Sequence, residues 1–206
     1  MYLPSMNYYI PFKPECYYHV FNRANSFETL FYNHDNYVFF LNKCEKYLNE
    51  ICTLYSFTLI PNHFHLIIWT RPESEIILYQ GKSYADRVSK AFSHLFNSYT
   101  RSYNIYHRRR GTLFSQHFKR AHLDSLSYLK NAVLYIHHNA VHHNICSDPD
   151  EWPYSSHRKV ISDPDDQTCV QFLSWFGGLD GYLTACRNYK PPGYSADFLE
   201  EVGSRK

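Results

Sequence analysis

The chain has 206 residues, of which 44% are hydrophobic and 19% charged, with 21 basic and 19 acidic side chains. These values describe an ordinary soluble globular protein, long enough for one domain with a sizeable core. No apolar run approaches the ~20 residues of a membrane-spanning helix, so we expect no membrane partner. The first residues lack the basic start and the apolar core of a secretory signal. Six cysteines without a C-x-x-C pair then indicate free thiols in a reducing cytoplasm.

The net charge of +2 is unevenly distributed along the chain. Residues 101–120 carry six basic side chains and no acidic one, which leaves 15 basic against 19 acidic residues elsewhere, a charge of −4. A basic island on a mildly acidic protein indicates a polyanion bound at one place. The plain alternative is a solvated run of charge. The 20 tyrosines and 15 phenylalanines offer aromatic faces on which bases can stack.

Apolar spacing and turn residues predict strands and helices in a clear order. The first part contains a strand at 16–21, a helix at 36–51 capped by Asp35, strands at 53–60 and 63–71, a helix at 84–103, and interrupted strand material at 112–114 and 118–123. The second part contains a helix capped by Asp124 or Ser125 and running to 141, an irregular stretch after 144, and two short helices at 167–176 and 179–188.

The order strand, helix, strand, strand, helix, strand is the split β-α-β arrangement of an α+β, ferredoxin-like (RRM-like) domain. In that arrangement an antiparallel sheet carries helices on one face, and the other face remains available for a site. We expect one domain over residues 1–157 and a helical or irregular C-terminal extension over 158–206, packed on the main domain.

Two histidines one residue apart lie in the apolar run that follows Pro61-Asn62. Because side chains alternate along a strand, His63 and His65 point to one face and Phe64 to the other. Two imidazoles side by side are a natural pair of metal ligands. A pair of polar residues on a solvated strand face is an equally ordinary interpretation of so short a motif.

The helix at 124–141 displays a second informative pattern. Its core stripe is predicted to consist of Leu126, Leu129, Val133, Ile136 and Ala140. Tyr135 falls roughly 140° from the centre of that stripe at ~100° per residue, and Tyr128, Tyr135 and Asn139 form a stripe of their own. Plain exposure is the default explanation for a tyrosine off the core face.

Together, a histidine pair, a basic island and a displaced tyrosine suit cleavage of a phosphodiester by a tyrosine nucleophile. A divalent ion on the histidines, Mg²⁺ or Mn²⁺, would polarise a phosphate oxygen. Tyrosine is a weak nucleophile because its ordinary pKa is ~10, and nearby positive charge favours the phenolate.

The segment Pro61-Asn62-His63-Phe64-His65-Leu66 resembles the histidine–hydrophobic–histidine motif of single-strand DNA endonucleases. The whole chain resembles the REP-associated tyrosine transposase branch of the single-tyrosine HUH transposases. The similarity covers about residues 15–157 in the expected order. It is carried by 18–23, 92–99, 109–114, 135–141 and 151–156.

This resemblance implies a bacterial, nucleoid-associated enzyme that cuts single-stranded DNA near a hairpin and leaves a 5′-phosphotyrosine and a free 3′-OH. By position, Tyr135 is the nucleophile, with Tyr128 as the minor rival, and His63 and His65 are metal ligands. Asn139 matches the place of a third ligand. For DNA contacts we select Asn22, Arg23, Arg108, Arg109, Arg110, Lys119 and Arg120. Relatives are monomers or homodimers, the latter donating the tyrosine in trans.

Several interpretations stay open at this level. One is a ferredoxin-like module that binds nucleic-acid hairpins without chemistry, and another, which leaves the basic island unexplained, is a structural metal protein. The branch usually has proline after the asparagine where this chain has Ala140, which leaves the end of the helix undetermined. The histidines around it are predicted to form a hydrated, partly cationic surface: His137, His138, His142 and His143.

Overall fold

The structure is a computed structural model, and it describes residues 9–26, 28–115 and 117–190. Four strands form one sheet in the order β2-β3-β1-β4. They are β1 (Tyr17–Arg23), β2 (Cys52–Ile60), β3 (His63–Thr70) and β4 (Lys119–His122), and every neighbouring pair is antiparallel. This order and the two helices between the strands are those of a ferredoxin-like domain. The predicted α+β fold class is confirmed.

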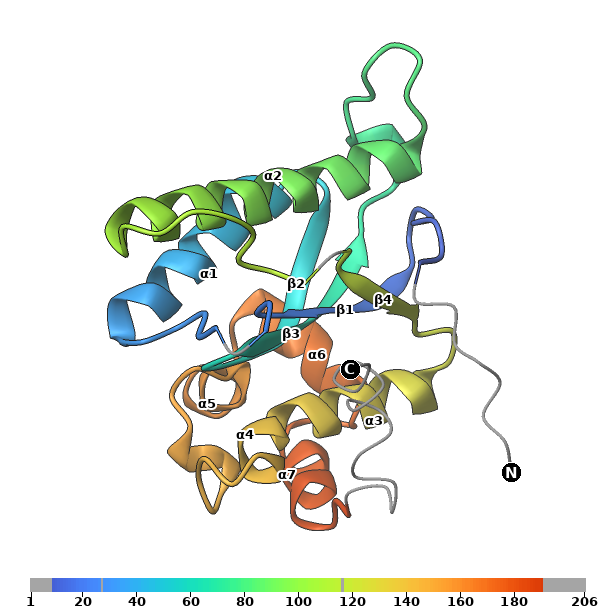
Figure 1. The fold of residues 1–206 in the computed structure, drawn as a ribbon. Coiled ribbons are helices and arrows are strands. Elements are labelled where there is room, and N and C mark those ends of the chain that lie inside the picture. The colour runs from blue at the N-terminus through green and yellow to red at the C-terminus, as the bar shows by residue number, and fades with distance from the viewer. Residues whose placement is uncertain (1–8, 27, 116, 191–206) are drawn as a thin grey trace, which may run out of the picture.

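Two long helices cover one face of the sheet (Figure 1). They are α1 (His34–Leu48) and α2 (Tyr84–Tyr106). The first begins two residues earlier than predicted because Asn33, rather than Asp35, accepts the capping hydrogen bond from the backbone of Asn36. The second begins with a capping box between Ser83 and Asp86. Their apolar faces pack on Phe64, Leu66 and Ile68 of β3, among others, in the larger hydrophobic core.

The opposite face of the sheet, which we expected to stay available for a site, is covered by the C-terminal helices (Figure 1). They are α3 (Leu126–His137), α4 (Asn139–His142), α5 (Ser156–Ser162) and α6 (Gln167–Ser174), and α7 (Leu179–Arg187) packs against them farther from the sheet (Figure 1). Two short 3₁₀ turns, Glu73–Glu75 and Pro149–Glu151, complete the elements. A second hydrophobic core lies here and joins Ile67 of β3 to Val133, Phe172 and Tyr182.

Several boundaries differ from the sequence-based expectation. Leu126, predicted to belong to the core stripe, is 55% exposed at the first position of α3, whereas the rest of that stripe is buried. α5 was expected to be irregular; it spans the predicted domain boundary at residue 157. α6 and α7 share a core with α3, and the last 16 residues of the predicted extension lie outside the described residues. The division into two units stays a prediction.

The predicted helix through residue 141 is interrupted at one residue. His138 ends α3 and precedes α4, with φ −90° and ψ 4°, and its ring nitrogen Nδ1 lies 2.8 Å from the carbonyl oxygen of Leu134. The helical path resumes in α4 and continues past Ala140 to His142. α4 directs Asn139 towards the sheet, where the Asn139 side chain is buried. Within the described part of the chain, no helix combines the length and the apolar content that crossing a bilayer requires.

Candidate active site

The histidine pair lies on the sheet face that carries α3 to α7. Alternation along β3 places Phe64 and Leu66 in the core beneath α1 and α2, while Ile67 joins the core on the other side. His63 and His65 share the face of Ile67. Both histidines are buried, with exposed fractions of 9% and 1%. A solvated strand face is therefore excluded for them.

The two ring nitrogens of His65 differ in their hydrogen-bond partners. Its Nδ1 lies 2.8 Å from Nε2 of His19, which stands beside it on β1. Its Nε2 is buried and has no hydrogen-bond partner among the described residues. If Nδ1 donates to His19, Nε2 of His65 is a bare lone pair, which is the form that coordinates a metal ion.

His63 brings two acceptors together. Its Nδ1 lies 2.8 Å from Oδ1 of Asn62. With the Asn62 amide in this orientation, Nδ1 is the donor and Nε2 of the neutral ring carries a lone pair. This Nε2 lies 3.1 Å from Oδ1 of Asn139. Rotating the Asn139 amide would pair its nitrogen with His63, but the oxygen would then occupy the buried position of Nδ2, which has no partner among the described residues. In either orientation one acceptor is left for a cation.

We call His19, His63, His65 and Asn139 the open cluster. Burial lowers the pKa of His19 and of His63 to about 3. For His63 the neighbouring His143 and Arg23 lower the pKa further, whereas the hydrogen bond with Asn139 opposes the shift. Burial, together with His19 and other neighbouring rings, holds the pKa of His65 well below its ordinary value. The rings are therefore neutral at pH 7, as metal ligands must be.

The donor set fits a divalent cation held by two imidazoles and one amide oxygen. Within the described residues, no group of three His, Cys, Asp or Glu side chains is arranged to hold a metal ion. A third protein ligand at the histidine pair therefore has to be of another type, and Asn139 supplies an amide oxygen 3.1 Å from Nε2 of His63. This three-ligand set stays a prediction, since it rests on the vacant nitrogen of His65 and the paired acceptors at His63.

Tyr135 projects from α3 against this cluster. Its ring centroid lies 5.8 Å from that of His65, edge to face at 86°. It also lies 5.4 Å from the ring of His142 on α4. Asn139 follows Tyr135 by four residues across the break at His138, so that Tyr135 contacts His65 and Asn139 contacts His63 of the same histidine pair. Of the two tyrosines on the predicted stripe, Tyr135 is the one that contacts the histidine pair.

The predicted DNA-contacting residues divide into separate groups. Arg23 pairs with His63 across β1 and β3, and Lys119 pairs with Phe21 across β1 and β4. Because paired residues share a face, both cations flank the open cluster. Asn22 points to the other face, is 8% exposed, and lies 3.4 Å through Nδ2 from the carbonyl oxygen of Ser115. Arg108 and Arg110 are exposed in the loop after α2.

Two of the predicted contacts are occupied within the protein. Arg109 forms an ion pair of 2.8 Å with Glu28 and donates to Oδ1 of Asn104. Arg120 donates to the carbonyl oxygen of Ile10, and its guanidinium lies 4.5 Å from the ring centroid of Phe12. These two arginines stabilise the loop and the N-terminal segment. Of the other four cations of the basic island, Arg101, Arg108 and Arg110 are exposed and Lys119 lies on the face of the open cluster.

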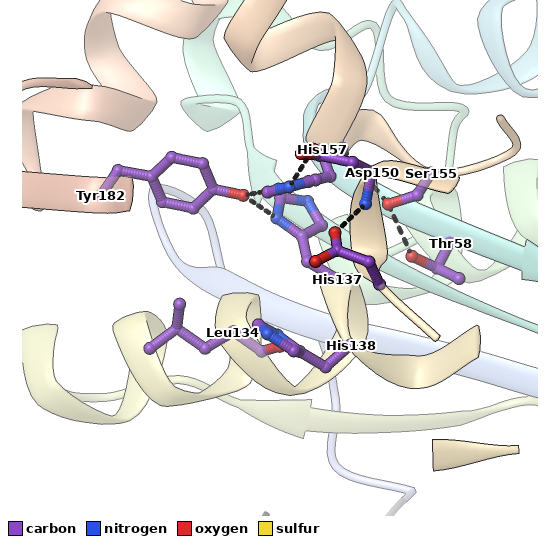
Figure 2. A network of polar contacts seen from close by, with 9 residues as sticks. Thr58, Leu134, His137, His138, Asp150, Ser155, His157 and Tyr182 are labelled. Atoms are coloured by element: carbon purple, nitrogen blue, oxygen red, sulfur yellow. Dashed lines mark hydrogen bonds and ion pairs between the residues drawn. The ribbon is translucent and has the colours of Figure 1, made fainter. Parts of the chain in front are cut away.

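Sequence reasoning missed a second histidine cluster, shown in Figure 2. His137, His157, Tyr182 and Asp150, which we call the closed cluster, join α3, α5 and α7. The Tyr182 hydroxyl contacts Nδ1 of both histidines, at 2.5 Å for His137. Nε2 of His157 lies 3.0 Å from Asp150, and Nε2 of His137 lies 2.7 Å from the Ser56 hydroxyl. The four ring nitrogens all have partners.

The prediction of a hydrated, partly cationic histidine surface is therefore wrong for His137, whereas His143 is exposed and His138 and His142 are half-buried. His137 is fully buried, and burial lowers its pKa well below the ordinary value. Burial also lowers the pKa of His138 and of His143, and that of His142 to about 4. His137 follows Val133 by one helical turn, as Val133 follows Leu129. That spacing was the available signal for its burial.

The sheet order and the site face define the class: a ferredoxin-like α+β domain with a histidine pair on an inner strand. No protein-family model matches the chain, and no curated protein matches it. Among solved structures, a REP-associated tyrosine transposase bound to a REP hairpin is similar, with a TM-score of 0.59 and 16% identity over 79% of this chain and 87% of that one. At this identity the likeness establishes the fold, and it confirms the predicted resemblance at that level.

Proposed function

We propose that this protein is a metal-dependent single-stranded DNA endonuclease or transposase. It would cleave and rejoin DNA near hairpins through a 5′-phosphotyrosine on Tyr135. The observation that carries the proposal is the placement of the Tyr135 ring against His65, beside the contact between His63 and Asn139. The shared fold with a hairpin-bound transposase supports a DNA hairpin as the partner.

The proposed step is an in-line displacement at one phosphorus. The Tyr135 oxygen forms a bond to phosphorus and loses its proton, while the bond from phosphorus to the 3′ oxygen breaks and that oxygen gains a proton. The strand is then attached to the protein through its 5′-phosphate, and attack by a 3′-OH reverses the step. The free energy of the ester is retained in the phosphotyrosine, so rejoining needs no added energy source.

The protein's own residues would supply orientation and charge. His63, His65 and Asn139 would hold a divalent ion, Mg²⁺ or Mn²⁺, which supplies Lewis-acid polarisation of a phosphate oxygen when bound. Arg23 and Lys119 lie on the same face and would contact neighbouring phosphates. Because Tyr135 reaches the histidines of its own chain, we propose that it acts in cis and that one monomer contains the complete site.

The test is a covalent adduct between the protein and a hairpin with single-stranded flanks, in the presence of Mn²⁺. The intact protein should give a species of reduced mobility that resists denaturation. Tyr135→Phe should give none while retaining binding of the hairpin. Tyr128→Phe, at the rival tyrosine on the same helix, should still form the adduct. An undiminished adduct from Tyr135→Phe would contradict the assignment.

The alternative is a hairpin-binding module without chemistry. It predicts binding that is independent of metal and no adduct on any hairpin. Binding requires neither a vacant imidazole nitrogen nor a tyrosine beside it, so the open cluster favours the enzyme.

A further inference from the structure

A pocket of about 440 Å³ adjoins the proposed site between α3 and the end of α7. The α3 side provides Tyr128, Asn131 and Tyr135, and the residues at and after the end of α7 provide Asn188, Tyr189 and Lys190. His19 of β1 also lines it, and because His19 is only 2% exposed, it marks the deep end. The pocket therefore shares two residues, His19 and Tyr135, with the site of the proposed chemistry.

The lining has the chemistry of a site for one nucleotide. Tyrosine rings on both walls offer flat faces for stacking, and the two asparagine amides each present a donor and an acceptor. The Tyr189 hydroxyl is buried and has no hydrogen-bond partner among the described residues, so a polar atom of a ligand would satisfy it. The exposed Lys190 places a positive charge at the rim, suited to a phosphate.

The size and position restrict the ligand further. Sites for small organic ligands occupy ~300–1,000 Å³, so the pocket suits one base rather than a length of double helix. A base can enter only when it is unpaired, which single-stranded DNA permits without the cost of breaking a pair. A base next to Tyr135 belongs to a nucleotide that flanks the phosphate under attack.

We infer that this pocket binds one unpaired nucleobase of the nucleotide flanking the cleaved phosphate, and so selects the site of cleavage. The inference rests on the proposed function, because the position of the pocket along the DNA strand is defined relative to the phosphate that Tyr135 would attack. The two tyrosine-bearing walls stack the base, and Asn131 and Asn188 hydrogen-bond its edge.

The experiment measures binding rather than cleavage. Tyr135→Phe protein is titrated with a hairpin carrying single-stranded flanks, with 2-aminopurine placed at each flank position in turn. Stacking on tyrosine quenches this base, so one position should be quenched more than all others. Asn188→Ala should weaken binding about fivefold, the effect of one hydrogen bond of ~1 kcal/mol. Asn97→Ala, an exposed asparagine on α2, is the matched control and should change nothing.

A strand with an abasic nucleotide at the quenched position completes the test. Without that base, the Asn188→Ala protein and its parent should bind equally, because the substitution then removes no contact. Uniform quenching along the flank, or a fivefold loss that persists with the abasic strand, would overturn the pocket assignment. Adduct formation by the intact protein, measured in parallel, reports the proposed function separately. Failure of every strand to bind would overturn both.

Discussion

The same face of the sheet carries two histidine clusters that differ in one respect. The histidines of both are buried, and burial lowers the pKa of His63 in the open cluster and of His137 and His157 in the closed cluster. In the closed cluster a single assignment satisfies every ring nitrogen: His157 donates to Asp150 and accepts from Tyr182, and His137 donates to Tyr182 and accepts from Ser56. In the open cluster no assignment does so among the described residues, because the buried Nε2 of His65 has no partner there.

The comparison shows that burial and a lowered pKa do not distinguish a ligand histidine from a structural one. The match between hydrogen-bond donors and acceptors at the ring nitrogens does distinguish them. A satisfied buried network stabilises a fold, whereas a buried acceptor without a donor costs free energy unless a ligand fills it. The closed cluster attaches α7 to α3 through His137, two residues from Tyr135, whereas the open cluster leaves the buried Nε2 of His65 without a hydrogen-bond partner among the described residues.

The largest expected effect comes from removing an imidazole of the open cluster. His63→Ala or His65→Ala should reduce the rate of adduct formation by more than ~100-fold, beyond the loss caused by removing a residue that only hydrogen-bonds to a metal ligand. Mn²⁺ binding, followed by electron paramagnetic resonance, should weaken in parallel, and excess metal should not restore the rate. Tyr182→Phe, in the closed cluster, should keep Mn²⁺ binding. Equal Mn²⁺ binding by His65→Ala would remove the distinction between the clusters.

Tyr182→Phe should lower the free energy of unfolding by about 2 kcal/mol, since it leaves two buried ring nitrogens without the hydroxyl they share. Urea denaturation measures the change. Tyr106→Phe, at a tyrosine that is 73% exposed, is the control and should change stability by less than ~0.5 kcal/mol. Equal stability of the two variants would show that the closed cluster does not stabilise the fold.

Acidification should destabilise the protein. The pKa of His19 and of His63 is about 3 in the folded state and ~6.5 when unfolded, so below pH ~6.5 the unfolded chain binds more protons. Each such histidine removes about 1.4 kcal/mol of stability per pH unit between pH 6.5 and 3. Urea denaturation at pH 7.5, 6.5 and 5.5 measures the slope. Stability that is constant over this range would contradict the neutral, buried state of both clusters.

The smallest effect is expected at the rim of the closed cluster. Asp150 is 66% exposed, so Asp150→Asn should cost less than ~1 kcal/mol, the range of solvent-screened ion pairs. The amide oxygen can still accept from His157. A loss as large as that of Tyr182→Phe would show that the ion pair, rather than the hydroxyl, stabilises the cluster.

Local patterns predicted much of the fold but not the pairing of distant polar groups. The helix α2 was predicted closely because it combines a regular apolar stripe with a capping residue. α5 was missed because its capping residue Ser155 and its first residue Ser156 are fixed by contacts with β2 about 100 positions earlier in the chain. The burial of His137 depends on Ser56 and Tyr182, which local periodicity cannot report.

The candidate site was predictable in part for the same reason. Alternation along β3 placed His63 and His65 on one face, and helical spacing placed Asn139 beside Tyr135. The contact of His19 with His65 depends on the register of β1 and β3. The contacts of Arg109 and Arg120 depend on segments that fold back against these side chains. A run of basic residues in a sequence does not reveal which of its side chains form ion pairs or hydrogen bonds within the protein.

The central claim is that Tyr135, beside the open cluster, becomes covalently attached to DNA. Trypsin separates the two rival tyrosines, because Lys130 lies between Tyr128 and Tyr135. After incubation with a hairpin and Mn²⁺, followed by nuclease and trypsin digestion, mass spectrometry should find a nucleotide 5′-phosphate on the peptide that begins at Asn131, with fragment ions assigning it to Tyr135. A modification on the peptide that ends at Lys130, or on neither peptide while the hairpin is bound, would contradict the account.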